Sequence, residues 1–278
     1  MPRHRVLTAL AALPLLALGA APAHADTTLR YAALGDSYAA GVAAGAYDGA
    51  SGECHRSTRA YPELWSAQHA PAELRHLACN GATVADVLRD QVPGVSADTS
   101  LVTLTAGGND LGFSDAAVAC LQPLTTDARC NQTLDESERR LREDLPARLD
   151  TLYRAVAAAA APTARVVVTG YPHLLRTGTT CLIGTDPRRQ RFNHVTDLLD
   201  EEIRRQAAAH GFAFADVRTA FEGHGVCSGP GQEWITGIVI PRLWESFHPT
   251  ADGQARGYLP AVGDAVAAAV TAVAAGRA

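Results

Sequence analysis

Short apolar runs alternate with longer segments of helical periodicity along most of this chain. Five runs have the length and composition of strands, at residues 29–34, 74–78, 100–105, 165–169 and 212–217. The run at 165–169, Arg-Val-Val-Val-Thr, has the continuous β-branched character of a strand buried on both faces. No two runs are joined by a hairpin turn. The alternation therefore predicts a single α/β domain, with a parallel sheet covered by helices on both faces.

The segments between these runs carry apolar side chains at helical spacing. We expect helices over residues 38–44, 60–69, 133–161 and 186–210, and a final alanine-rich helix after Thr250. Pro146 interrupts the long pattern at 133–161. Asp186-Pro187 supplies an N-cap and a first-turn proline, and Gly211 ends that helix. Residues 218–247, rich in Gly, Pro and Trp, are predicted to be irregular.

The first 25 residues have the features of a secretory signal peptide. Arg3 and Arg5 form a basic start, and residues 6–20 form an apolar stretch too short to span a bilayer comfortably. Ala23-His24-Ala25 then places small residues at the two positions that a signal peptidase reads. We therefore expect residues 1–25 to be removed, residues 26–278 to form the domain, and the protein to be secreted without stable membrane insertion.

The chain contains six cysteines, an even number that indicates disulfides in an exported protein. No C-x-x-C pair or adjacent Cys/His spacing indicates a metal site. Sequence alone leaves the connectivity open. We expect sequential pairing, because short closures within one connecting segment are the easiest to make without crossing the sheet. The expected pairs are Cys54–Cys79, Cys120–Cys130 and Cys181–Cys227.

Charge argues against two classes of partner. The net charge is −5, and every basic residue is arginine. Removal of Arg3 and Arg5 with the leader makes the chain more negative. A negative surface without basic clusters argues against nucleic-acid binding and against docking on anionic membranes.

Polar residues follow three of the predicted strands. They are Ser37, Gly81 and the stretch 107–109, and in an open parallel sheet such residues meet at the carboxyl edge, where ligands bind. Ser37 stands at the junction of a strand and a helix. Free N–H groups and the partial positive charge of the helix start can stabilise an oxyanion there. The G-x-S-x-G motif of ordinary α/β-hydrolases is absent.

Four motifs together resemble a known family. Gly35-Asp36-Ser37, Asn80-Gly81-Ala82, Gly107-Gly108-Asn109-Asp110 and His248-Pro249 resemble, in order, the four blocks of the SGNH hydrolases, also called GDSL lipases/esterases. The predicted leader together with six cysteines makes the chain similar to the secreted Streptomyces-type actinomycete lipases and esterases of that family. The resemblance implies a flavodoxin-like three-layer α/β/α fold with a five-stranded parallel sheet, and serine catalysis without metal or cofactor.

The resemblance also implies a role for each motif. Ser37 would attack the ester and form an acyl-serine intermediate, with His248 as the base. The oxyanion hole would comprise the backbone N–H groups of Ser37 and Gly81 and the side chain of Asn109. His173 and His224 also lie in predicted loops at this edge, and they are the alternative bases.

The third catalytic group departs from the family pattern. The usual block has Asp three residues before the histidine, and this chain has Glu245 there. Either Glu245 orients the His248 imidazole, or the backbone carbonyl of Ser246 does so, as in some actinomycete members. We expect the carbonyl.

The expected function is hydrolysis of lipid esters by an extracellular, monomeric lipase or esterase, with phospholipids included among the substrates. One alternative is a carbohydrate acetyl esterase of the same family, although no module of exposed aromatic residues favours it. The other is a non-catalytic secreted binding protein. The presence of Ser37, Asn109 and His248 argues against that alternative. Trp234 and Trp244 either line an acyl groove or pack in the core.

Overall fold

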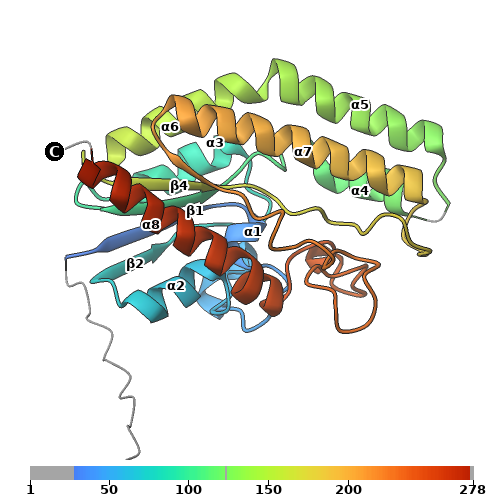
Figure 1. The fold of residues 1–278 in the computed structure, drawn as a ribbon, viewed down its shortest axis with the longest axis horizontal. Coiled ribbons are helices and arrows are strands. Elements are labelled where there is room, and N and C mark those ends of the chain that lie inside the picture. Colours follow the sequence, from blue (N-terminus) through green and yellow to red (C-terminus); the bar gives the residue numbers. More distant parts are fainter. Residues whose placement is uncertain (1–27, 123, 276–278) are drawn as a thin grey trace, which may run out of the picture.

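A computed structural model describes residues 28–122 and 124–275, so the expected leader lies outside the described residues. A five-stranded parallel sheet forms its centre, in the order β2-β1-β3-β4-β5 (Figure 1). The strands are β1 (Arg30–Gly35), β2 (Glu73–His76), β3 (Leu101–Thr105), β4 (Arg165–Thr169) and β5 (Ala213–Ala215). The predicted single α/β domain with a parallel sheet is confirmed.

Helices cover both faces of the sheet (Figure 1). One face carries α5 (Asp127–Glu143), α6 (Leu145–Ala159) and α7 (Asp186–Ala209), together with α3 (Val84–Asp86) and α4 (Phe113–Leu121). The other face carries α2 (Tyr61–His69) and α8 (Leu259–Ala275), which contact each other. A single helical turn, α1 (Ser37–Ala40), follows β1 directly.

The central strands are buried on both faces, which explains their continuous apolar character. All five residues of β3 are buried, and so are Val166, Val167 and Val168 of β4. Buried threonines on these strands find partners inside the sheet. Thr105 and Thr169 share a hydrogen bond of 2.6 Å between their hydroxyls, and Thr103 Oγ1 bonds the Tyr31 hydroxyl at 2.8 Å.

Two expected helices have different bounds in the structure. The pattern at 133–161 forms two helices, because the chain turns at Asp144 and Pro146 stands in the first turn of α6. Proline has no N–H to continue a helix but suits its start. The helix expected over 38–44 ends after one turn, because Gly41 adopts a left-handed conformation with φ of 78°.

Three disulfides pair the six cysteines in sequence order: Cys54–Cys79, Cys120–Cys130 and Cys181–Cys227. The first links the loop after α1 to the loop after β2, and the second links α4 to α5. The third joins the loop before α7 to the irregular segment after β5. Within the described residues, each helix is either too short or too polar to cross a membrane.

Candidate active site

The turn between β1 and α1 places Ser37 at the carboxyl edge of the sheet. Gly35 has a φ of 130°, and a Cβ on it would lie 2.2 Å from the carbonyl oxygen of Thr105. The buried amide of Gln91 accepts from the Gly35 N–H at 2.7 Å and donates to its carbonyl at 2.8 Å. Asp36 then caps α1 by accepting from the Tyr38 N–H at 2.9 Å. Ser37 therefore begins the helix in a tightly held turn.

His248 reaches the same edge from the irregular segment before α8. The Thr236 hydroxyl holds its loop, because it accepts from the His248 N–H at 3.2 Å and donates to the Glu245 carbonyl at 2.6 Å. The Tyr38 hydroxyl donates to the carbonyl of Phe247 at 2.9 Å. Phe247 adopts a left-handed conformation with φ of 61°, which is rare for a bulky residue. The histidine loop is thus attached to the helix that carries Ser37.

The serine hydroxyl and the imidazole form one row of hydrogen bonds. His248 Nε2 lies 2.7 Å from Ser37 Oγ, and His248 Nδ1 lies 2.9 Å from the carbonyl oxygen of Ser246. A carbonyl only accepts, so Nδ1 carries the hydrogen and Nε2 accepts the serine O–H. Burial lowers the pKa of His248 to about 4, although the Ser246 carbonyl opposes this shift. The imidazole is therefore neutral at ordinary pH and free to take a proton.

The carboxylate of Glu245, the other candidate for orienting His248, bonds partners other than the imidazole. This buried carboxylate accepts from the Tyr47 hydroxyl at 2.7 Å and pairs with Arg242 Nε at 2.9 Å. These bonds hold the turn before the histidine against the loop after α1. At the position that the family pattern gives to an Asp, this structure thus has a carboxylate bonded to Tyr47 and Arg242.

Ser37, Gly81 and Asn109 border the same pocket, as the sequence motifs imply for an oxyanion hole. Gly81 has a φ of 75°, and no atom lies within 4 Å of where its Cβ would stand. The left-handed conformation of Gly81, rather than any lack of space, thus favours glycine there. The Asn109 side-chain N–H donates to the Ala82 carbonyl at 2.9 Å, which joins the loops after β2 and β3.

Tyr171 connects two of these loops, and the sequence motifs assigned it no role. Its hydroxyl donates to Asp36 Oδ2 at 2.5 Å and accepts from the Gly108 N–H at 3.1 Å. Burial raises the pKa of Asp36 to about 7, although the hydrogen bonds from Tyr171 and Tyr38 oppose the shift. The only sequence signal was the place of Tyr171, directly after Gly170 at the carboxyl end of a buried strand.

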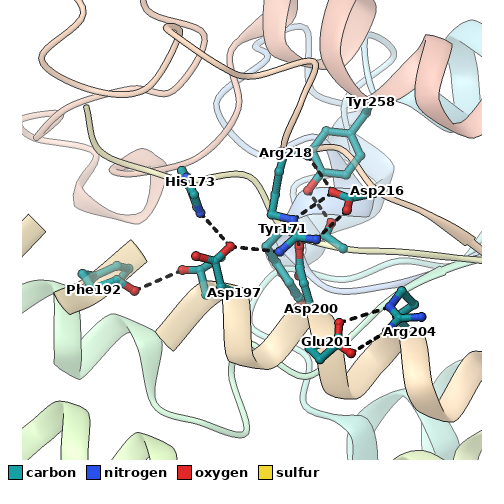
Figure 2. Close-up of polar contacts among 12 residues, drawn as sticks. Tyr171, His173, Phe192, Asp197, Asp200, Glu201, Arg204, Asp216, Arg218 and Tyr258 are labelled. Atoms are coloured by element: carbon teal, nitrogen blue, oxygen red, sulfur yellow. Dashed lines mark hydrogen bonds and ion pairs between the residues drawn. The ribbon is translucent and has the colours of Figure 1, made fainter. Parts of the chain in front are cut away.

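A network of charged side chains supports Tyr171 from beneath (Figure 2). Asp200, on α7, accepts from the Tyr171 N–H at 2.8 Å and is fully buried, which raises its pKa. Arg218 Nε lies 3.6 Å from Asp200 Oδ2, and the Arg218 guanidinium also pairs with Asp197 at 2.9 Å. His173 bonds Asp197 at 2.8 Å in the same network (Figure 2).

Neither alternative histidine borders the pocket at Ser37. His173 belongs to the network around Asp197. His224 stacks on Trp234 with ring centroids 3.7 Å apart, and its Nδ1 bonds the Gln232 carbonyl at 2.7 Å.

An apolar pocket of about 420 Å³ opens beside Ser37 and His248. Its apolar lining comes from α4, from the loop after β4 and from the segment before His248. These residues are Phe113, Ala117, Val118, Leu121, Leu174, Ile238, Leu243, Trp244 and Phe247. Trp244 thus lines the pocket, whereas Trp234 is buried against Phe221 in the core. Among the described residues, no three His, Cys, Asp or Glu side chains group as metal ligands.

Comparison with known proteins places this chain in a family. The pattern of the GDSL-like Lipase/Acylhydrolase family matches residues 33–256. Lipase 1 of Streptomyces coelicolor is 44% identical over 249 residues, which cover 90% of this chain and 90% of that protein.

Two solved structures share the whole fold. The extracellular lipase of Streptomyces rimosus superposes with a TM-score of 0.81 at 42% identity, covering 85% of this chain and 99% of that one. Phospholipase A1 of Streptomyces albidoflavus NA297 gives a TM-score of 0.81 at 42% identity, covering 86% and 99%. The chain therefore belongs to the GDSL-like Lipase/Acylhydrolase family, and it is a carboxylic ester hydrolase.

Proposed function

We propose that this protein is a secreted, monomeric lipase that hydrolyses long-chain carboxylic esters of lipids, phospholipids included. Ser37 is the nucleophile and His248 the base, with its imidazole oriented by the Ser246 carbonyl. The observation that carries the proposal is the row of hydrogen bonds from Ser37 through His248 to Ser246. All three residues border an apolar pocket.

The first half of the reaction transfers the acyl group to the enzyme. Ser37 Oγ attacks the ester carbonyl while its proton passes to His248 Nε2. The imidazolium then forms with its Nδ1–H already bonded to the Ser246 carbonyl, which stabilises the new charge. His248 Nε2 returns the proton to the departing alkoxide, the C–O bond breaks, and an acyl-serine remains.

The second half repeats these steps with water. His248 takes a proton from the attacking water. It then returns that proton to Ser37 Oγ as the bond between the acyl carbon and Oγ breaks, which releases the carboxylic acid and restores the Ser37 hydroxyl. Both intermediates place a negative oxygen toward the Ser37 and Gly81 N–H groups and the Asn109 side chain. Losing one such donor commonly costs roughly 10²–10³ in turnover.

The shape and lining of the pocket support a lipid acyl chain as the group transferred. Phe113, Ala117 and Leu121 from α4 line the pocket beside Ser37 with apolar surface. An alkyl chain gains from leaving water there, by roughly 0.8 kcal/mol for each buried CH₂. An acetyl group would leave most of this surface unfilled. The relatives named as lipases and phospholipase A1 support the same substrate class.

Secretion is supported by the leader features of residues 1–25, by three disulfides, and by a relative described as extracellular. We expect the secreted domain, residues 26–278, to begin at Asp26. Mass spectrometry of the protein from culture medium tests this, and an intact leader would contradict it.

Hydrolysis of a chain-length series of nitrophenyl esters tests the function. We expect kcat/KM to rise with acyl-chain length from acetate upward, and Ser37→Ala to abolish it. Ser114→Ala is the matched control, because Ser114 borders the same pocket but is exposed and lies on α4. Activity surviving in Ser37→Ala would remove the nucleophile, and a preference for acetate would favour the acetyl esterase.

A further inference from the structure

The exposed large apolar side chains of the described residues gather at one end of the molecule. They are Val118, Leu124, Leu182, Ile238, Ile240 and Leu243, here called the apolar rim. Leu124 is 98% exposed, Leu182 90% and Ile240 81%. Scattered single apolar side chains are normal on a surface, but a concentration of them marks an interaction site.

Half of the apolar rim borders the pocket at Ser37, and the rest lies on neighbouring segments of the chain. Val118, Ile238 and Leu243 border the pocket themselves. Ile240 lies between two of these residues in the chain, and Leu124 follows the end of α4 by three residues. All the segments that carry the rim lie at the end of the molecule where α4 and the irregular segment before α8 meet (Figure 1).

The loop that carries Leu182 is fastened to the others. The Cys181–Cys227 disulfide joins it to the irregular segment, and Gly184 packs so closely that a Cβ would lie 3.0 Å from the Cys120 carbonyl. The buried guanidinium of Arg189 donates to the carbonyls of Thr179 and Gly184. Leu182 therefore stands on a loop that these contacts hold in place.

Two arginines near the rim form ion pairs with carboxylates. Arg242, between Ile240 and Leu243, pairs with Glu245 at 2.9 Å. Arg188 pairs with Asp127 at 2.5 Å beside the loops of Leu124 and Leu182. The whole chain carries a net charge of −5 and no lysine. An anionic lipid surface would therefore be repelled, whereas a surface without net charge would not.

We propose that the apolar rim docks the enzyme on the surface of aggregated lipid without net charge, such as a phosphatidylcholine bilayer. The inference rests on the proposed function, because long-chain lipid esters are aggregated in water and must enter the pocket from an interface. Apolar side chains penetrate the boundary between headgroups and acyl chains by about 5–10 Å when they bind such a surface. Docking by the rim turns the pocket mouth toward the lipid.

The test compares one rim variant on dissolved and on aggregated substrate. Leu124→Ser/Leu182→Ser/Ile240→Ser changes three exposed side chains, none of which borders the pocket. We expect sedimentation with phosphatidylcholine vesicles to weaken by roughly tenfold or more, because apolar area no longer enters the lipid. Hydrolysis of the vesicles should fall in parallel, and kcat/KM on dissolved nitrophenyl butyrate should stay unchanged.

A gain of binding gives the opposite control. Ile240→Trp should strengthen vesicle binding several-fold, because tryptophan favours the lipid–water interface. Thr163→Trp adds the same side chain at an exposed position before β4, on the opposite edge of the sheet, and should change nothing.

Equal vesicle binding by wild type and the triple variant would overturn the proposal, and so would tighter binding to phosphatidylglycerol than to phosphatidylcholine. A wild-type dimer that the triple variant makes monomeric, with vesicle binding unchanged, would assign the rim to a second copy of the chain. Absence of activity on dissolved ester in the wild type would instead reject the proposed function.

Discussion

At the scale of single residues, the His248 imidazole is held by a carbonyl where a carboxylate is usual. A carbonyl fixes the tautomer and the ring orientation, but its partial charge does less than a full charge to favour the imidazolium. Burial therefore dominates and lowers the pKa of His248 to about 4. The base remains unprotonated in weakly acidic solution.

This pKa sets an expected pH dependence. His248 acts as a base only when neutral, so activity is lost as pH falls through its pKa in the free enzyme. As the pH is lowered from neutral to 6.5, we expect kcat/KM on a dissolved ester to stay constant. It should fall only near pH 4, where His248 becomes protonated. A pH–rate profile on a short-chain ester measures this, and a decline already beginning near pH 7 would contradict it.

A pair of variants distinguishes His248 from its neighbour Glu245. His248→Ala removes the proton acceptor of Ser37, and we expect kcat to fall by about 10⁶-fold. Glu245→Gln keeps an acceptor for the Tyr47 hydroxyl, and we expect less than about a tenfold loss because the carboxylate does not contact the imidazole. Steady-state kinetics of both variants give the answer. A comparable collapse in Glu245→Gln would show that the carboxylate acts on His248.

Tyr171 is expected to position the nucleophile loop. In Tyr171→Phe, buried Asp36 loses its hydroxyl partner and the Gly108 N–H loses its acceptor. We expect kcat to fall by about tenfold with little change in KM, and stability to fall by about 1–3 kcal/mol. Tyr258→Phe is the control, because its hydroxyl donates only to the Gly170 carbonyl. Equal kinetic effects in both would make Tyr171 merely structural.

At the scale of elements, the carboxyl edge of the sheet assembles the site from separate loops. β1 delivers Ser37, and the loops after β2 and β3 deliver Gly81 and Asn109. The turn from β1 into α1 has the tightest packing of these, because Gly35 lies against the Thr105 backbone of β3.

Gly35→Ala tests that packing. The new Cβ would clash with backbone, which cannot rotate away, and φ of 130° is unfavourable for alanine. We expect a loss of stability of about 3 kcal/mol or more, with loss of activity as Ser37 shifts. Gly211→Ala is the control, since Gly211 also has a positive φ, 70°, but nothing lies within 4 Å of its Cβ position. Urea unfolding that gives similar losses for both would show that strain alone, without the clash, sets the cost.

At the scale of the whole molecule, three disulfides hold the loops around a core that the sheet and helices form. Two of these disulfides close segments of very different length. Cys181 and Cys227 are 46 positions apart in the chain, and Cys120 and Cys130 are 10 positions apart. In the chain-entropy view the longer closure restricts the unfolded chain more.

We therefore expect the double variant Cys181→Ser/Cys227→Ser to lose more stability than Cys120→Ser/Cys130→Ser. The estimates are about 4 and about 3 kcal/mol. The first variant should also lose vesicle hydrolysis at temperatures where it remains folded, because the loop of Leu182 is released. Thermal unfolding and vesicle assays measure both effects. Greater destabilisation by the shorter closure would contradict the entropic explanation.

Much of the fold was predictable because its signals are local. The apolar run at 165–169 became β4 with the same bounds, since burial on both faces leaves a continuous apolar signature. The predicted helix bounds were wrong where a single residue ended a helix, as at Gly41 and Asp144. Tyr171 could not be assigned a role, because its partners Asp36 and Gly108 are 135 and 63 positions away in the chain.

The sequence by itself determined the α/β architecture, the order of the four motifs and the edge of the sheet at which they would meet. Only the tertiary structure showed which groups lie against His248 and which bond Glu245. Glu245 is close to His248 in the chain. Its carboxylate nevertheless accepts a hydrogen bond from Tyr47, which is 198 positions from Glu245. Such contacts depend on which side chains meet in the folded protein, and no local sequence pattern indicates them.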